Sequence, residues 1–110
     1  MPDATTAKIA ELNDQARQTF GECRVVITQG VAELGKCDVA SILDKVRKYK
    51  DFTPINDPYF EHDFGSIQFG ENTIFWKIDY YDIDLQMHSP DPSDPAVTTR
   101  ILTIMLAEEY

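Results

Sequence analysis

The chain has 110 residues, 43% hydrophobic side chains and a net charge of −9, which favours one ordinary globular domain spanning residues 1–110. The charge is uneven: residues 1–50 carry seven acidic and eight basic side chains, whereas residues 51–110 carry twelve and two. DNA, RNA and anionic lipid repel such a surplus of carboxylates, so the composition argues against direct nucleic-acid binding and against docking on a membrane.

The first third of the chain predicts a helix followed by a strand. Over residues 5–20, apolar side chains recur every three or four positions, with Thr5 or Thr6 as the cap and Gly21 as the stop. Residues 24–28 (RVVIT) are short and β-branched, which is typical of a strand. The apolar stripe of the helix comprises Ile9, Leu12, Ala16 and Phe20.

A connection and a second helix follow. Residues 30–36 begin with Gly30 and contain Gly35, which indicates a connecting segment. Asp38 is expected to cap a helix over residues 38–50. The apolar stripe of this helix comprises Val39, Ile42, Leu43, Val46 and Tyr49.

The second half of the chain predicts a β-hairpin between two loops. Residues 52–63 contain two prolines and cannot be helical throughout. Residues 63–69 and 73–81 alternate apolar and polar side chains around a Gly70-Glu71-Asn72 turn, the signature of a hairpin. After a proline-rich loop over residues 82–95, residues 97–106 favour a strand, with a helix as the open alternative.

The order of these elements indicates an α+β fold. Two helices are expected to pack on one face of a mostly antiparallel sheet of about four strands, in the order α-β-α-β-β-β.

Features of the chain also bear on its compartment. No secretory signal and no apolar run of about 20 residues is present. Cys23 and Cys37 lack the CxxC spacing of zinc ribbons and thioredoxin-type pairs. We expect a cytoplasmic protein, monomeric or homodimeric, with free thiols and no cofactor.

Three sequence stretches resemble a known bacterial family. They are NDPYFEHDFG at residues 56–65, FWKIDYYD at residues 75–82 and SPDPSDPAVTTRILTIMLAEEY at residues 89–110. The chain is similar, from about Ile9 to Tyr110, to the family catalogued as domain of unknown function 3768. The resemblance implies a small single-domain protein, often encoded on plasmids and other mobile elements, and it assigns no catalytic role. One departure, Gln86-Met87-His88 in place of a glycine-containing turn, counts against a role for His88.

A histidine between acidic residues is the candidate for catalysis. His62 can move protons near neutral pH, and a carboxylate can orient it. Neighbouring residues of an extended chain point in opposite directions, so its partner would be a distant carboxylate such as Asp79 or Asp82. A small hydrolase using His62 with Asp63, Asp79 or Asp82 is therefore the alternative function. We expect instead that His62 stabilises the turn at residues 56–58.

A metal site is a second alternative. Asp79, Asp82 and Asp84 form a DxxDxD pattern at a strand end, with His88 close behind and His62 across the hairpin. Oxygen-rich clusters suit Ca²⁺ or Mg²⁺, and histidine with aspartate suits Zn²⁺ or Mn²⁺. The glycine and glutamate of an EF-hand loop are absent, however, and so is HExxH. We therefore expect a solvated acidic strand end.

The acidic second half favours a protein-binding function. Between residues 51 and 94, ten acidic side chains and one basic one alternate with aromatic residues, a combination suited to gripping Arg and Lys. The expected partner-binding residues are Asp79, Tyr81, Asp82, Asp84, Glu61, Asp63, Asp91 and Asp94. We predict an interaction or inhibitor protein that blocks a basic surface of a partner, such as a nucleic-acid-binding complex. If the mobile-element association holds, CRISPR or restriction effectors of host defence are the natural targets, with carboxylates mimicking DNA phosphates.

Overall fold

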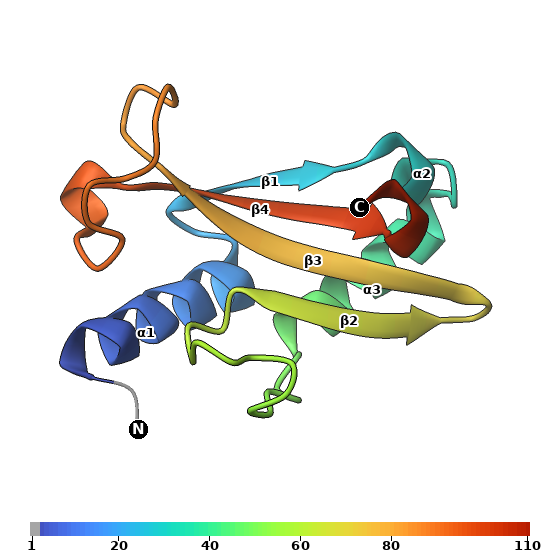
Figure 1. Cartoon of the computed structure of the whole chain (residues 1–110). Helices are drawn as coiled ribbons and strands as arrows, with labels where there is room; N and C mark the ends of the chain where they lie inside the picture. The colour runs from blue at the N-terminus through green and yellow to red at the C-terminus, as the bar shows by residue number, and fades with distance from the viewer. Residues whose placement is uncertain (1–2) are drawn as a thin grey trace.

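The computed structural model describes residues 3–110 (Figure 1). In chain order, the elements are α1 (Ala4–Thr19), β1 (Cys23–Ile27), α2 (Gln29–Ala32), α3 (Lys36–Arg47), β2 (Phe64–Phe69), β3 (Asn72–Tyr81) and β4 (Thr99–Leu106). Single 3₁₀ turns precede β4 at Pro95–Val97 and follow it at Ala107–Glu109. The predicted α+β fold is confirmed, and residues 99–106 form a strand.

The four strands form one mixed sheet in the order β1-β4-β3-β2. The predicted hairpin pairs β2 with β3, and β3 also runs antiparallel to β4. At the other edge, β1 pairs with β4 in parallel, with Val25 opposite Leu102. Two of the three strand pairs are thus antiparallel, as expected, and the parallel pair joins segments about 75 positions apart in the sequence.

The helices α1 and α3 cover one face of the sheet (Figure 1). On β3 the alternation buries Ile74, Trp76 and Ile78 against the helices, because successive strand residues point to opposite faces. The core of this layer comprises Val31, Ile42, Val46, Tyr49, Ile74, Trp76, Ile78, Leu102 and Ile104. Within residues 3–110, no helix is long and apolar enough to cross a membrane.

The opposite face of the sheet is largely open. It presents Phe75, Lys77 and other odd-numbered residues of β3. The C-terminal residue Tyr110 folds back over one part of this face, where its ring lies 5.7 Å from that of Phe75 and 6.1 Å from that of Phe64. The rest of the open face extends to the end of the sheet at which β3 ends, at Tyr81.

The ends of α1 differ from the prediction. Asp3, not Thr5 or Thr6, caps the start, because its carboxylate accepts a 2.7 Å hydrogen bond from the Thr6 backbone. At the other end Phe20, not Gly21, adopts the left-handed conformation, with φ 56°. The Phe20 ring then lies under the Arg47 guanidinium, 4.3 Å away, a contact that compensates for the strained backbone.

The second helix begins two residues earlier than predicted. Gly35 (φ 100°) precedes α3, so Asp38 lies in the first turn and not at the cap. There its carboxylate still complements the positive end of the helix dipole. The predicted connection at residues 30–36 also contains most of the short helix α2, which ends in Ala32. Tyr49 is buried as expected, but it lies beyond the last residue of α3.

A buried arginine joins the two helices. Arg17 on α1 is 1% exposed and donates hydrogen bonds from Nη1 to the backbone oxygens of Val46 (2.9 Å) and Arg47 (3.0 Å) at the end of α3. Its Nη2 pairs with Asp14 at 3.1 Å. The last carbonyls of a helix have no partner within the helix, so Arg17 supplies one from outside.

Candidate functional site

The predicted partner-binding residues collect at one end of the sheet. At this end, drawn at the left of Figure 1, β1, β2 and β4 begin and β3 finishes. Asp79, Tyr81, Asp82 and Asp84 lie at or after the end of β3, Glu61 and Asp63 precede β2, and Asp91 and Asp94 precede β4. The topology therefore brings together acids that are dispersed over 34 positions of the sequence.

These residues nevertheless divide between the two faces of the sheet. Asp79 lies on the open face, where its carboxylate pairs with Lys77 at 3.1 Å. Glu61 lies on the helix side and accepts a 2.8 Å hydrogen bond from the Tyr80 hydroxyl. The structure therefore does not form one continuous patch from all eight residues.

The loop after β3 is held by its own hydrogen bonds. The Asp82 backbone donates to the Met87 carbonyl at 2.8 Å, and Gln86 donates to the Asp82 carboxylate at 3.0 Å. Ser89 returns to the strand with a 3.1 Å bond to the Tyr80 carbonyl. Residues 82–87 consequently form a closed tip that projects from the sheet (Figure 1).

Two large apolar side chains are exposed on this tip. Ile83 is 57% and Met87 71% exposed, on either side of the exposed Asp84. Lone apolar residues are common on protein surfaces, and here two lie on one tip among carboxylates, which makes the tip a candidate binding surface. We call Asp79, Tyr81, Asp82, Ile83, Asp84 and Met87 the loop surface.

The carboxylates of Asp91 and Asp94 stabilise the segment that precedes β4. Asp91 accepts hydrogen bonds from the backbone (3.1 Å) and hydroxyl (2.6 Å) of Ser93. Asp94 caps the 3₁₀ turn by accepting from Ala96 at 2.9 Å. Their carboxylates therefore shape the approach to β4 and add negative charge at the same end of the sheet.

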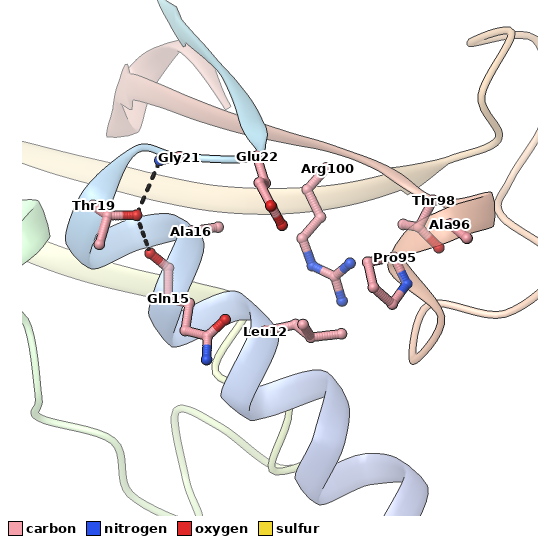
Figure 2. A pocket seen from close by; sticks show the side chains of 10 residues that line it. All are labelled: Leu12, Gln15, Ala16, Thr19, Gly21, Glu22, Pro95, Ala96, Thr98 and Arg100. Carbon is pink, nitrogen blue, oxygen red and sulfur yellow. Dashed lines mark hydrogen bonds between the residues drawn. The ribbon is translucent and has the colours of Figure 1, made fainter.

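On the helix side, a buried polar network joins α1, β3 and β4. Asn13 is 0% exposed; its Nδ2 donates to the Glu61 carbonyl (2.9 Å) and the Tyr80 hydroxyl (2.7 Å). Its Oδ1 accepts from Arg100 Nε at 2.7 Å. Burial raises the pKa of Tyr80 and lowers that of Arg100. Arg100 also reaches a cavity between α1 and the segment before β4 (Figure 2).

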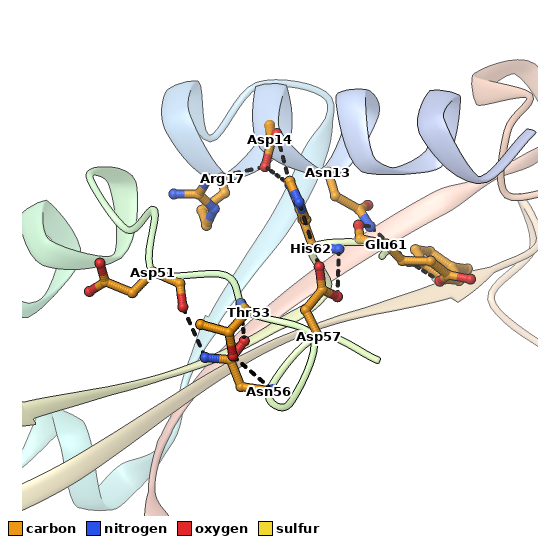
Figure 3. A network of polar contacts seen from close by, with 10 residues as sticks. Asn13, Asp14, Arg17, Asp51, Thr53, Asn56, Asp57, Glu61 and His62 are labelled. Carbon is orange, nitrogen blue, oxygen red and sulfur yellow. Dashed lines mark hydrogen bonds and ion pairs between the residues drawn. The ribbon is translucent and has the colours of Figure 1, made fainter. Parts of the chain in front are cut away.

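His62 lies between two carboxylates (Figure 3). Its Nδ1 is 3.1 Å from Asp14 on α1, and its Nε2 is 3.5 Å from the buried Asp57. The ring stacks on Phe52 with centroids 3.9 Å apart, and the backbone nitrogen donates to Asp57 at 3.2 Å. The backbone of His62 has φ 55°, a conformation that costs about 1–2 kcal/mol, which these contacts offset.

This geometry confirms that His62 stabilises its turn. The structure does not bring it together with Asp79, which pairs with Lys77 on the open face, or with Asp82, which holds the loop tip. The part of the chain from residue 3 onward has no group of three or more His, Cys, Asp or Glu side chains arranged to hold a metal ion. Of the two carboxylates beside His62, Asp57 belongs to the turn at residues 56–58 that His62 was expected to stabilise, whereas Asp14 on α1 was not foreseen from the sequence.

Asp63, which follows His62, has a carboxyl group whose ionised form is disfavoured by its surroundings. Burial, and secondarily the nearby Glu61, raise the pKa of Asp63. We therefore expect Asp63→Asn to be more stable than the unchanged protein at neutral pH. The folded pKa exceeds the unfolded one, so this advantage shrinks as the pH falls and is gone below the unfolded value of about 3.9.

Urea unfolding of both proteins across this pH range measures the difference. A stability difference independent of pH would contradict the expectation, because it would arise from packing and not from charge.

Several important residues were missed in the sequence. Asn13 and Arg17 recur in phase with the apolar Ile9, so two polar side chains occupy the buried stripe of α1. Polar residues in the apolar stripe of a helix indicate buried hydrogen bonds, so their spacing could have identified Asn13 and Arg17 from the sequence. Arg100 carries a similar signal, because it alternates with the buried Leu102 and Ile104 on β4.

Comparison with known proteins gives one match. The family model described as "Protein of unknown function (DUF3768)" matches residues 27–109, about three quarters of the chain. The match begins at the last residue of β1, so α1 lies outside it. Neither the curated proteins nor the solved structures contain a match.

Proposed function

The chain belongs to the DUF3768 family, whose function is unknown, and from its own residues we propose that it is a small acidic interaction protein. It binds a basic surface of a protein partner through the loop surface. The observation that carries this proposal is the exposure of Ile83 and Met87 on an ordered acidic tip.

The apolar pair supplies what a charged patch alone lacks. Protein interfaces combine a small apolar centre, which loses water on binding, with a polar rim that determines orientation. Ile83 and Met87 fit the centre, and Met adapts readily to partner surfaces because its side chain is unbranched and polarizable. The fixed backbone of residues 82–87 lowers the entropy lost on binding.

The carboxylates of the loop surface are available to a cationic partner. Lys77 neutralises Asp79, but Asp82 and Asp84 have no ion pair among residues 3–110. Charge of one sign at the end of the sheet attracts a basic partner over about a Debye length. A basic surface that otherwise binds nucleic acid is a suitable partner, since carboxylates can take the place of phosphates.

The test compares two variants of equal charge. In one, Asp79, Asp82 and Asp84 are replaced by asparagine; in the matched control, Glu33→Gln, Asp38→Asn and Asp44→Asn change exposed acids of the helical segment. We expect the first variant to lose about tenfold or more of its affinity for proteins captured from host lysate, and the control to lose little. Asparagine at position 82 retains the acceptor for Gln86, so the tip stays folded.

Two further arms sharpen the result. Ile83→Ser with Met87→Ser should also weaken capture, and a DNA oligonucleotide should displace the protein from a partner whose nucleic-acid site it occupies. Equal capture by the acidic-loop variant and the control would refute the proposed surface. Capture that does not weaken between low and moderate salt would refute the role of charge.

A further inference from the structure

A cavity of about 710 Å³ lies between α1, the start of β1 and the segment that enters β4 (Figure 2). It is separate from the loop surface, with which it has no residue in common. Its wall includes Leu12, Gln15, Ala16, Glu22, Thr98 and Arg100. The lining is about equally polar and apolar, and a volume of several hundred Å³ is in the range of small-molecule sites.

The floor of the cavity holds a buried guanidinium group. Arg100 is 4% exposed, yet it has no carboxylate within ion-pair distance among residues 3–110. Its Nε donates to Asn13 and its Nη2 to the Pro92 carbonyl, while Nη1 has no hydrogen-bond partner in this part of the chain. Glu61 acts on this charge only from beyond ion-pair distance, through the network of Tyr80 and Asn13. The free Nη1 therefore remains available to donate to an anionic ligand.

The opposite charge lies at the rim of the same space. Figure 2 shows the Glu22 carboxylate and the Arg100 guanidinium both pointing into the cavity from separate elements. They do not form an ion pair with each other. One cation and one anion give the cavity no net charge, which disfavours a dianion such as phosphate and favours a zwitterion.

We propose that this cavity binds a free α-amino acid with a large apolar side chain. Arg100 donates hydrogen bonds from Nη1 to the carboxylate of the ligand, and Glu22 accepts hydrogen bonds from its ammonium group. Leu12 and Ala16 offer the side chain an apolar wall, and Gln15 and Thr98 add polar groups beside it. Arg100 is held in place by Asn13 and by its stacking over Tyr80, 5.2 Å from the ring centroid, so the site is formed before the ligand arrives.

The test uses three ligands that differ by one group each. Phenylalanine carries both charges, phenylalaninamide lacks the carboxylate and phenylpropionate lacks the amine. In an NMR titration of the full chain, we expect phenylalanine to shift the backbone signals of Leu12, Ala16 and Thr98. The other two ligands should bind about tenfold or more weakly, because each leaves one charged group without its partner.

A substitution at the rim of the cavity should change which of two ligands binds more tightly. Glu22 is exposed, so Glu22→Gln should fold normally, and Glu33→Gln on the exposed surface near α2 serves as its control. We expect Glu22→Gln to lower the affinity for phenylalanine about tenfold. Its affinity for phenylpropionate should equal or exceed that of the unchanged protein. Equal affinity for phenylalanine and phenylalaninamide would overturn the assignment to Arg100. Shifts at these residues with inorganic phosphate but not with phenylalanine would overturn the choice of ligand.

Discussion

Arg17→Met is expected to lower the free energy of unfolding by about 3 kcal/mol, because hydrogen bonds from a buried charged group are worth about 1.5–3 kcal/mol. The change removes the Arg17 donors to the carbonyls of Val46 and Arg47 at the end of α3. The Val46 carbonyl keeps its 3.3 Å hydrogen bond from the Tyr49 backbone, whereas the Arg47 carbonyl loses its partner. It also removes the cation that lies 5.5 Å from the Phe52 ring and 5.3 Å from the Trp76 ring. Methionine retains the aliphatic part of the side chain, so the loss of stability measures the contribution of the guanidinium group and not that of side-chain volume.

Urea unfolding followed by far-ultraviolet circular dichroism measures this loss. Lys48→Met is the control: Lys48 also pairs with an acid, Asp44 at 2.9 Å, but both side chains are more than half exposed. Such surface pairs contribute about 0.3–0.5 kcal/mol. If Arg17→Met cost no more than Lys48→Met, the proposed joining of α1 to α3 by Arg17 would be wrong.

Gly65→Ala should destabilise the protein by about 1–3 kcal/mol, since it forces an extra methyl group into a filled core. A Cβ atom at position 65 would lie 2.3 Å from Nε1 of Trp76, on the facing position of β3. Trp76 is 0% exposed and packs against Tyr49 and Phe52, so a shift of its ring would disturb the core. The glycine therefore provides space for the indole and not conformational freedom.

A second substitution tests this explanation. Trp76 Nε1 is buried without a hydrogen-bond partner in the described residues, so Trp76→Phe loses volume but no hydrogen bond. In that background, Gly65→Ala should cost less, and the double-mutant cycle should show coupling of about 0.5–3 kcal/mol. Ser66→Ala, on the exposed side of the same strand, should change stability by less than about 0.5 kcal/mol. Additive losses would show that Gly65 acts through its backbone.

Elements defined by short-range patterns were predicted well. The hairpin was evident because the alternation from Thr73 to Tyr81 and the Gly70 turn lie within twenty residues of each other. Helix boundaries were less accurate. Side-chain capping depends on which neighbouring oxygen reaches the first free amide, and at α1 the carboxylate of Asp3 does so.

The candidate surface was partly predictable. The carboxylates of the loop surface lie within six positions at or after the end of β3, so their proximity to one another required no knowledge of the fold. The sequence did not show which side chains of the loop point outward, and Ile83 and Met87 were not singled out. Their exposure follows from the hydrogen bonds that close the tip between Asp82 and Met87.

The sequence by itself determined the acidic second half, the amphipathic helices and the hairpin, because spacing of two to four residues decides which side chains share a face. Only the tertiary structure decided that β1 pairs in parallel with β4, that His62 contacts Asp14 across 48 positions, and that Arg100 and Glu22 border one cavity. These contacts join segments whose separation in the sequence carries no periodic signal. They depend on how the helices pack on the sheet, and therefore on the free energy of the whole core.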